Sequence, residues 1–386
     1  MTISVLVNMS TLVVGGGVQI GVSFFEFASN FKSGDIDFYF LLSKSIFENL
    51  SEKKLKNTNY RVFNNSPAKI IKGWRSRREI LEIEKNLNPD LVYSIGFPSY
   101  IKFNKIEIGR YTNPWEIYPT RAAWKLLPLH ERLFVWLKTK YRIQWARNIS
   151  YYETQTIPAK VAICELFRLS ERQIKVIPNS YNPIFKENIS ISQQKKTSKQ
   201  KVIFCLSAAY RHKNLEIIPS VAKHLSSIDP DLPVKFILTL PQDSKLWNEI
   251  NAKAQKFEVE EKIKNIGPLK LQDCVTQYKD ADAVFLPTML EVFSATYLEA
   301  MAMLKPIITS DLEFAHASCG DAAIYFDPKS SLAAAESIHT VIKDSTISDR
   351  IVKNGREQLK LFPDFFHKHK LIINWLREIA DKEGIR

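Results

Sequence analysis

The sequence predicts an α/β protein whose strands form parallel sheets in more than one domain. Short apolar runs, typical of buried parallel strands, alternate with longer stretches whose apolar residues recur at helical spacing. Such alternation favours a parallel sheet with helices on both faces. The 386 residues suffice for two or three domains. A polar, charged stretch at 186–200, poor in large apolar residues, is the best linker candidate.

The strand candidates of the first half are separated by helical stretches. A glycine-rich turn follows the first of them and leads into an amphipathic helix. Glycine backbone can approach a phosphate closely, but no complete dinucleotide or P-loop motif is present, so an ordinary flexible turn is the alternative. The strand candidates are 3–7, 36–43, 89–96, 105–112 and 173–183, a helix is predicted around 69–87, and the turn contains Gly15, Gly16 and Gly17.

Four polar or aromatic residues stand where the strand candidate 105–112 ends. They are Arg110, Thr112, Asn113 and Trp115. Parallel sheets collect ligands at the carboxyl ends of their strands, which makes Asn113 a candidate for ligand contact. Asn113 also precedes Pro114, so a turn asparagine is the alternative interpretation.

A basic, aromatic-rich stretch follows at 121–149. Its composition fits a helical segment on an anionic membrane, or a core-packing helix pair with a solvated basic face. It contains no recognised nucleic-acid motif, so we expect no nucleic-acid partner. The stretch has one acid, Glu131, against Arg121, Lys125, Arg132, Lys138, Lys140, Arg142 and Arg147, and its apolar residues include Trp124, Leu127, Leu133, Phe134, Trp136 and Trp145.

The composition as a whole favours an acidic partner and a reducing compartment. The formal net charge is +13, which suits a nucleotide, a nucleic acid or an anionic membrane surface. The cysteines Cys164, Cys205, Cys274 and Cys319 are scattered without a CxxC pair, which predicts neither a disulfide framework nor a zinc site. No signal peptide and no run of about 18 apolar residues is present. We expect a cytoplasmic protein, located at the inner face of the membrane if the basic stretch binds there.

The second half contains the stretch on which the functional prediction depends. Residues 285–311 predict a strand, a loop, a helix and a second strand. Glu291 falls in the loop and Glu299 inside the helix, so the two carboxylates flank a helix N-terminus. The N–H groups of such a terminus bind phosphates, and carboxylates accept hydrogen bonds from sugar hydroxyls. This combination predicts a nucleotide-sugar site.

The order of residues in this stretch resembles a known family. Glu291 and Glu299 have seven residues between them, followed by AMA and then Lys305-Pro306 and two apolar residues. This pattern is similar to the E-x7-E signature of retaining glycosyltransferases of family 4, also called glycosyl transferases group 1. The family usually has glycine where Val292, Ser294 and Leu304 stand.

The resemblance implies the GT-B architecture, in which two Rossmann-like domains face each other across a cleft. It implies an acceptor-binding domain at 1–184, a nucleotide-sugar donor-binding domain at 185–362, and a C-terminal helix at 363–386 that crosses back to the first domain. Further strands of the second domain are expected near 202, at 234–240, 262–269 and 322–328.

The resemblance also implies roles for individual residues. Glu291, Lys213 and Asn113 are the catalytic candidates, with Lys213 neutralising the donor diphosphate. The family often has an arginine at the position of Ser207, for which Arg211 is the candidate substitute. Glu299 is expected to bind the ribose. The donor-binding candidates are Gly16, Gly17, Arg211, Lys213, Gly267, Pro268, Leu269, Glu291, Phe293, Ser294, Ala295, Thr296 and Glu299.

The predicted reaction moves a sugar from a UDP- or GDP-sugar to a glycan or lipid-linked glycan in bacterial surface polysaccharide synthesis. We expect no cofactor and no metal, and interpret the Asp35/Asp37 and Asp280/Asp282 pairs as chance DxD matches. A nucleotide-sugar epimerase or hydrolase of the same fold, and a non-catalytic nucleotide-sugar-binding scaffold or partner subunit, are the alternatives.

Overall fold

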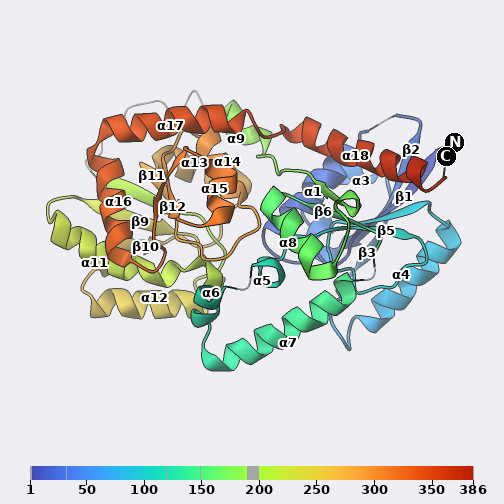
Figure 1. Cartoon of the computed structure of the whole chain (residues 1–386), viewed down its shortest axis with the longest axis horizontal. Coiled ribbons are helices and arrows are strands. Elements are labelled where there is room, and N and C mark those ends of the chain that lie inside the picture. The colour runs from blue at the N-terminus through green and yellow to red at the C-terminus, as the bar shows by residue number, and fades with distance from the viewer. Residues whose placement is uncertain (1, 32, 119, 148, 189–199, 386) are drawn as a thin grey trace. The chain divides into compact units, whose positions relative to one another are not determined.

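The computed structural model describes residues 2–31, 33–118, 120–147, 149–188 and 200–385 (Figure 1). Contacts divide the chain into two compact units. The first unit comprises Met1–Ile117, Leu133–Pro178 and Phe366–Arg386, and the second comprises Tyr118–Arg132 and Asn179–Phe365. Residues 189–199 of the predicted linker lie outside the described residues.

The described residues of the first unit form a parallel sheet with the strand order β3-β2-β1-β4-β5-β6-β7. The predicted strands contain β2, β4, β5 and β7, and the prediction at 3–7 covers all of β1 except its last two residues. The strands are β1 (Ile3–Met9), β2 (Ile36–Ser43), β3 (Asn59–Phe63), β4 (Leu91–Ser94), β5 (Ile106–Arg110), β6 (Tyr151–Thr154) and β7 (Ile174–Val176). The helices before β6 are α1 (Gly16–Ala28), α2 (Lys44–Phe47), α3 (Glu52–Leu55), α4 (Trp74–Leu87), α5 (Pro114–Ile117), α6 (Arg121–Lys125) and α7 (Leu129–Ala146); α8 (Ile157–Phe167) follows β6.

The C-terminal helix α18 (Phe365–Lys382) packs on the first unit although most of the second unit precedes it in sequence. The ring of His369 stacks on Phe27 with the centroids 5.0 Å apart. Arg377 donates to Asp35 at 2.8 Å. These contacts confirm the prediction that the last helix returns to the N-terminal domain. Its buried face is formed by Lys368, His369, Ile372, Ile373, Trp375, Leu376, Ile379 and Ala380.

A cluster of ionisable side chains is buried in the first unit. Nε of Arg110 lies 3.5 Å from Oε1 of Glu153, and the two side chains are 2% and 0% exposed. The hydroxyl of Tyr93 donates to the same carboxylate. Burial, followed by the charge of Arg110, lowers the pKa of Lys368 on α18 to about 7. Glu153 is therefore the carboxylate that faces two cationic groups in this cluster.

The described residues of the second unit form a parallel sheet with the order β10-β9-β8-β11-β12-β13. The strands are β8 (Lys201–Cys205), β9 (Val234–Leu238), β10 (Ile263–Asn265), β11 (Ala283–Leu286), β12 (Ile307–Ser310) and β13 (Ala323–Phe326). The helices are α9 (Pro183–Glu187), α11 (Ile218–Ile228), α12 (Lys245–Lys256), α13 (Leu271–Asp280), α14 (Ala295–Ala302), α15 (Glu313–Cys319), α16 (Ser331–Lys343) and α17 (Ser345–Leu359).

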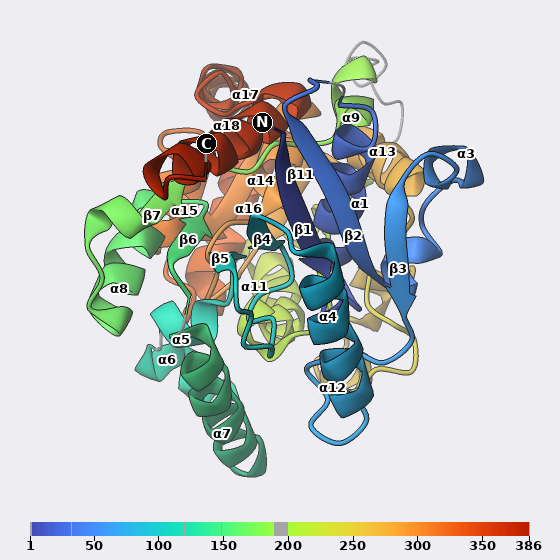
Figure 2. The ribbon, with the colours of Figure 1, turned by 90° about the vertical axis from the view of Figure 1, so that its right-hand side faces the viewer.

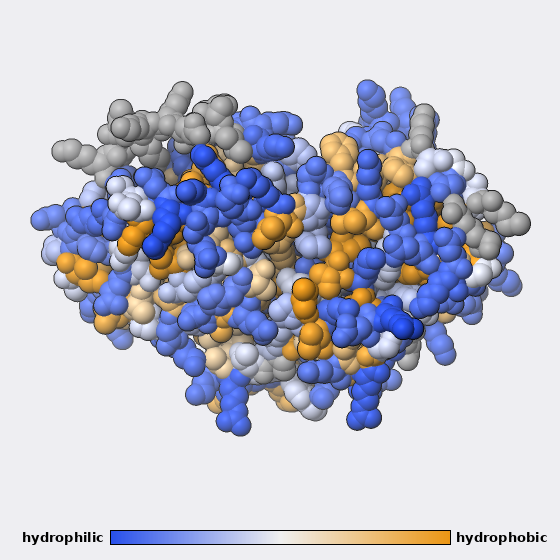
Figure 3. All heavy atoms as spheres, turned by 45° about the horizontal axis from the view of Figure 1, so that its top comes forward, coloured by the Kyte–Doolittle hydropathy of each residue, from blue (hydrophilic) through white to orange (hydrophobic). Residues whose placement is uncertain are grey.

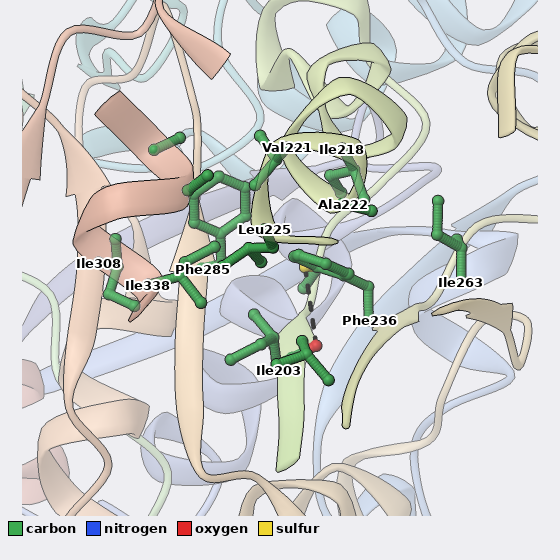
Figure 4. Packing of buried hydrophobic residues seen from close by; sticks show 14 of the residues in the cluster. Ile203, Ile218, Val221, Ala222, Leu225, Phe236, Ile263, Phe285, Ile308 and Ile338 are labelled. Atoms are coloured by element: carbon green, nitrogen blue, oxygen red, sulfur yellow. Dashed lines mark hydrogen bonds between the residues drawn. The ribbon is translucent and has the colours of Figure 1, made fainter. Parts of the chain in front are cut away.

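The core of the second unit contains one apolar cluster between the sheet and helices α11 and α16, and another that includes buried residues of α13 and α14. Figure 4 shows Ile203, Phe236 and Phe285 from the strands facing Val221 and Leu225 of α11. These side chains are at most 3% exposed. The alternation of apolar strands and amphipathic helices thus produces the predicted Rossmann-like unit.

Hydrophilic side chains cover most of the face shown in Figure 3, with hydrophobic residues visible between them. Over the described residues, the structure contains no helix that is long and apolar enough to span a membrane.

Candidate active site

The strand order of the second unit creates a switch point between β8 and β11. From β8 the chain continues to β9 and β10 on one side, whereas β12 and β13 lie on the other side, beyond β11. In open parallel sheets the loops that follow two such strands diverge, and ligands bind in the crevice between them. The loop after β8 carries Lys213, and the loop after β11 carries Glu291. The topology therefore brings the two residues to the same edge of the sheet.

Lys213 and Glu291 form an ion pair between these two loops. Their side chains are 16% and 15% exposed, so solvent screens the pair only in part. Beside the pair, the N–H of Met289 donates to the carbonyl oxygen of His212 at 2.8 Å and ties the loops together. An ammonium group has three donors, so Lys213 can hold Glu291 and still offer N–H groups to an incoming anion.

Asn214 fixes the turn that presents Lys213. Residues Arg211–Lys213 form one turn of 3-10 helix, and Asn214 ends it with φ of 55°, in the left-handed region that asparagine tolerates. Its Nδ2 donates to the carbonyl oxygen of Pro328 at 3.0 Å. Burial and the charge of Lys213 lower the pKa of His212 to about 3, so its imidazole is neutral.

Helix α14 begins directly after the Glu291 loop with an open N-terminus. Ser294 is its N-cap, but the Ser294 side chain makes no capping hydrogen bond, and no acidic residue occupies the first turn. Ala295 is exposed and Thr296 is partly exposed. The first N–H groups of a helix have no intrahelical acceptor and carry partial positive charge, so this terminus can receive a phosphate.

The absence of the family's usual glycines affects one position in this region. Ser294 has φ of −103°, and Val292 is not among the described residues with positive φ. Leu304, just beyond the end of α14, has φ of 55°, where glycine would carry less strain. The loop around Glu291 therefore needs no glycine at Val292 or Ser294 to adopt this conformation.

Glu299 lies in the second turn of α14 and is held by a residue that the sequence analysis missed. The hydroxyl of Tyr278 on α13 donates to Oε2 of Glu299 at 2.8 Å. Burial raises the pKa of the Glu299 carboxyl to about 7, while the hydrogen bond from Tyr278 opposes that rise. Glu299 is only partly exposed, which agrees with the direction of this shift.

The guanidinium group of Arg211 forms hydrogen bonds with carboxylates of the second unit. It donates to Glu216 at 3.0 Å and to both oxygens of Glu249, with the longer contact at 2.8 Å. Glu131 lies 3.8 Å away. These hydrogen bonds raise the pKa of Arg211 and lower that of Glu249. Lys213, not Arg211, is therefore the cation in direct contact with Glu291, and the diphosphate role of Arg211 stays a prediction.

Gly267 begins the loop that the resemblance associates with the nucleotide base. Its φ is +83°, a conformation that a side chain would strain. Nδ2 of Asn265 donates to the Leu240 carbonyl oxygen at 2.9 Å, while its Oδ1 accepts from the N–H groups of Leu240 at 2.9 Å and Gly267 at 3.4 Å. Pro268 is exposed and Leu269 partly buried. Asn265, which the sequence analysis did not single out, thus fixes this loop.

Phe293 has a packing role in the structure. It is 8% exposed and its ring contacts Phe362 edge-on, with the centroids 5.7 Å apart. This contact anchors the loop between Glu291 and α14 to the segment that follows α17.

The remaining candidates, Gly16, Gly17 and Asn113, belong to the first unit. Gly16 and Gly17 are the first residues of α1 and do not precede it, and this helix also lacks a side-chain cap and an acid in its first turn. Asn113 forms the turn before α5, since its Oδ1 accepts from the N–H of Trp115 at 3.1 Å and its Nδ2 donates to Glu116 at 2.7 Å. The turn interpretation therefore describes Asn113 in this structure.

One aspartate of each DxD pair makes a structural contact. Asp282 accepts from the N–H of Val202 at 2.7 Å, and Asp35 accepts from Arg377. Among the residues that the structure describes, no group of three His, Cys, Asp or Glu side chains is placed to hold a metal ion.

Residues 186–358 match the model of the family described as glycosyl transferases group 1. This segment lies within the second unit and contains Lys213, Glu291 and Glu299. An uncharacterized glycosyltransferase of Methanocaldococcus jannaschii is 24% identical over 214 residues, which are 52% of this chain and 53% of that protein. The O-antigen chain mannosyltransferase RfbU of Salmonella typhimurium is 22% identical over 225 residues, which are 58% and 59% of the two chains. The chain thus spans little more than half the length of these curated relatives.

Solved structures share the fold over nearly the whole chain. HepE of Anabaena, in a complex with UDP and glucose, has a TM-score of 0.71 at 16% identity, covering 98% of this chain and 100% of that one. A sucrose-phosphate synthase of Thermosynechococcus elongatus has a TM-score of 0.74 at 14% identity, with the same coverage. These similarities show two Rossmann-like domains of the GT-B type.

Proposed function

We propose that this chain, whose residues 186–358 match the family model of glycosyl transferases group 1, transfers a sugar from a nucleoside-diphosphate sugar to an acceptor hydroxyl with retention of configuration. The observation that carries the proposal is the contact between Lys213 and Glu291, at the switch point of the sheet and beside the open N-terminus of α14. The family match over 186–358 supports it. That HepE was crystallised with UDP-glucose supports a nucleotide-sugar donor.

The donor diphosphate is proposed to bind at the α14 terminus. The N–H groups of Ala295 and Thr296 and the ammonium of Lys213 would surround it with positive charge. When the bond between the anomeric carbon and the diphosphate breaks, negative charge grows on the departing phosphate oxygen. Preorganised donors stabilise that charge in the transition state. No metal is invoked, because the proposed site supplies this positive charge itself.

Glu291 is proposed to orient the donor sugar, and Glu299 the ribose. A carboxylate accepts hydrogen bonds from two neighbouring hydroxyls, and Glu291 carries its charge next to the Lys213 ammonium. The acceptor oxygen forms its bond to the anomeric carbon as the bond to the diphosphate breaks, and its proton passes to the departing phosphate oxygen. The match to an O-antigen chain mannosyltransferase supports a glycan or lipid-linked glycan acceptor in surface polysaccharide synthesis.

Nucleotide binding tests this proposal without knowledge of the acceptor. In a thermal-shift panel of UDP, GDP, ADP, CDP and dTDP, we expect UDP or GDP to stabilise the wild type by about 2.7 kcal/mol at a hundredfold excess over Kd. Glu299→Ala should lose most of this shift, because it removes the proposed ribose ligand. The exposed Glu336→Ala on α16 is the matched control and should keep it. A panel without any shift would argue against the transferase. Nucleotide binding without transfer to any acceptor would indicate the scaffold, and release of free or epimerised sugar the hydrolase or epimerase.

The pKa of Glu299 predicts a pH dependence with opposite signs for the free and the bound protein. Burial raises this pKa from 4.5 to about 7, so the folded protein holds a proton on Glu299 that the unfolded chain has lost between these pH values. The contribution of Glu299 to the stability of the free protein therefore falls as pH rises from 4.5 to 7. A ribose diol binds the ionised form, so nucleotide affinity should rise between pH 6 and 8. Titrating the wild type and Glu299→Gln with the nucleotide found above checks this, and an unchanged pH profile in the variant would contradict it.

A further inference from the structure

The first half of α7 exposes a stripe of large apolar residues. Their relative exposure runs from 48% for Trp136 to 79% for Leu129. Soluble proteins rarely leave several such side chains uncovered on one short stretch of helix. Figure 2 shows α7 extending away from the sheet of the first unit. The α7 stripe, as we call it, consists of Leu129, Leu133, Phe134, Trp136 and Leu137.

The second half of α7 shows which of its faces is attached to the first unit. Tyr141 stacks on Tyr100 with centroids 5.6 Å apart, and Trp145 contacts the same ring at 6.2 Å. Arg142 pairs with the buried Glu116. At about 100° per residue, Leu129 and Trp136 lie on the opposite side of the helix from these anchors, and Leu133 lies between the two sides. Phe134 and Leu137 lie toward the side of the anchors and are exposed because they precede these contacts along the helix.

The exposed face of α7 continues with positive charge. Lys140 lies on the same side as the stripe, with its Nζ 6.0 Å from the centroid of the Trp136 ring, and Arg147 follows about two turns later. Both are exposed, as are Lys125 and Arg121 on α6. The segment's acid, Glu131, belongs to the second unit and lies within 3.8 Å of both Arg211 and Lys245, so its charge is matched within that unit.

We propose that the α7 stripe docks this protein on an anionic lipid surface. Leucine, phenylalanine and tryptophan insert into the boundary between head groups and acyl chains, while lysine and arginine stay at the level of the anionic head groups. Charge complementarity favours an anionic lipid surface over a second copy of the chain. A second copy would place the same cations on both sides of the interface, where they would repel each other. Within α7, the core-packing interpretation fits only the second half of the helix; before α7, Ala123 and Leu127 are also buried.

The proposal is independent of the transferase reaction and can be tested without nucleotide or acceptor. The probes are vesicles of phosphatidylcholine alone and vesicles that also contain phosphatidylglycerol, used in flotation assays with the full chain. The test variant is Leu133→Ser/Trp136→Ser. The matched control is Val161→Ser, which changes an apolar residue that is 52% exposed on α8 of the same unit. Thermal unfolding verifies that both variants are folded.

We expect the wild type and Val161→Ser to float with the anionic vesicles and the double variant to bind them more than about tenfold more weakly. Lys140→Glu should weaken binding to the anionic vesicles about fivefold or more. Raising the salt concentration should weaken vesicle binding by the wild type, since salt screens the attraction between the cations and the anionic head groups. Three results would each overturn the proposal: no vesicle binding by the wild type, equal binding by the double variant, or a lipid-free dimer that the double variant abolishes.

Discussion

Replacing Glu291 with glutamine is expected to lower the rate of sugar transfer by about 10²- to 10³-fold. Glutamine keeps the size of the side chain but removes the charge that contacts Lys213 and that would act on the donor sugar in the transition state. Nucleotide affinity should persist or increase, because Lys213 then has no competing carboxylate. Initial rates with the identified donor, together with nucleotide thermal shifts, measure both effects.

A structural role of Glu291 predicts a different pattern. If the residue only held the Lys213 turn in place, Glu291→Gln would lower nucleotide affinity and stability together. Lys213→Ala serves as the comparison, because it should weaken nucleotide binding while leaving Glu291 in the loop. Transfer at the wild-type rate by Glu291→Gln would remove Glu291 from the proposed mechanism.

Replacing Glu153 with glutamine is expected to destabilise the first unit by about 3–5 kcal/mol. The change leaves Arg110 and Lys368 buried without the carboxylate that faces them. Because burial lowers the pKa of Lys368 to about 7, Lys368 carries its charge mainly at lower pH, so the loss should be larger at pH 6 than at pH 9. Urea unfolding with hydrogen exchange of β4, β5 and β6 measures the loss in this unit.

The control for this prediction is an ion pair at the surface of the same unit. Arg61 and Glu79 are 57% and 38% exposed, and Glu79→Gln should cost less than about 1 kcal/mol. If Glu153→Gln lowers the free energy of unfolding no more than Glu79→Gln does, the buried cluster tolerates the missing charge, which would contradict the prediction.

The elements that the sequence predicts well are those whose partners are close in the chain or whose side chains are uniformly apolar. Strands β3 and β6 were not predicted. In β3, Asn59 and Arg61 are exposed and little of the strand is buried, so its apolar signal is weak. In β6 the buried residues include Glu153, whose polarity is offset by Arg110 from a neighbouring strand. Local composition cannot reveal such a distant partner.

The same limit applies to the candidate site. The motif around Glu291 and Glu299 and the basic turn at Lys213 could be recognised from local order. The pairing of Arg211 with Glu249 could not, since Glu249 lies on another helix, 38 residues along the chain. The contact from Tyr278 to Glu299 was missed for the same reason. Which charges remain available to a ligand depends on contacts that only the folded chain brings together.

The return of α18 to the first unit has a consequence for how this protein is made. The helix supplies buried residues such as Trp375 and Leu376, yet it is synthesised after all of the second unit. A nascent chain that has reached Pro178 therefore exposes the apolar surface that α18 will cover. Every segment of the second unit precedes residue 366. The second unit can therefore fold before the first unit is complete. A chain that stops before α18 lacks the helix that covers the apolar surface of its first unit. We expect such a chain to be unstable and to be degraded.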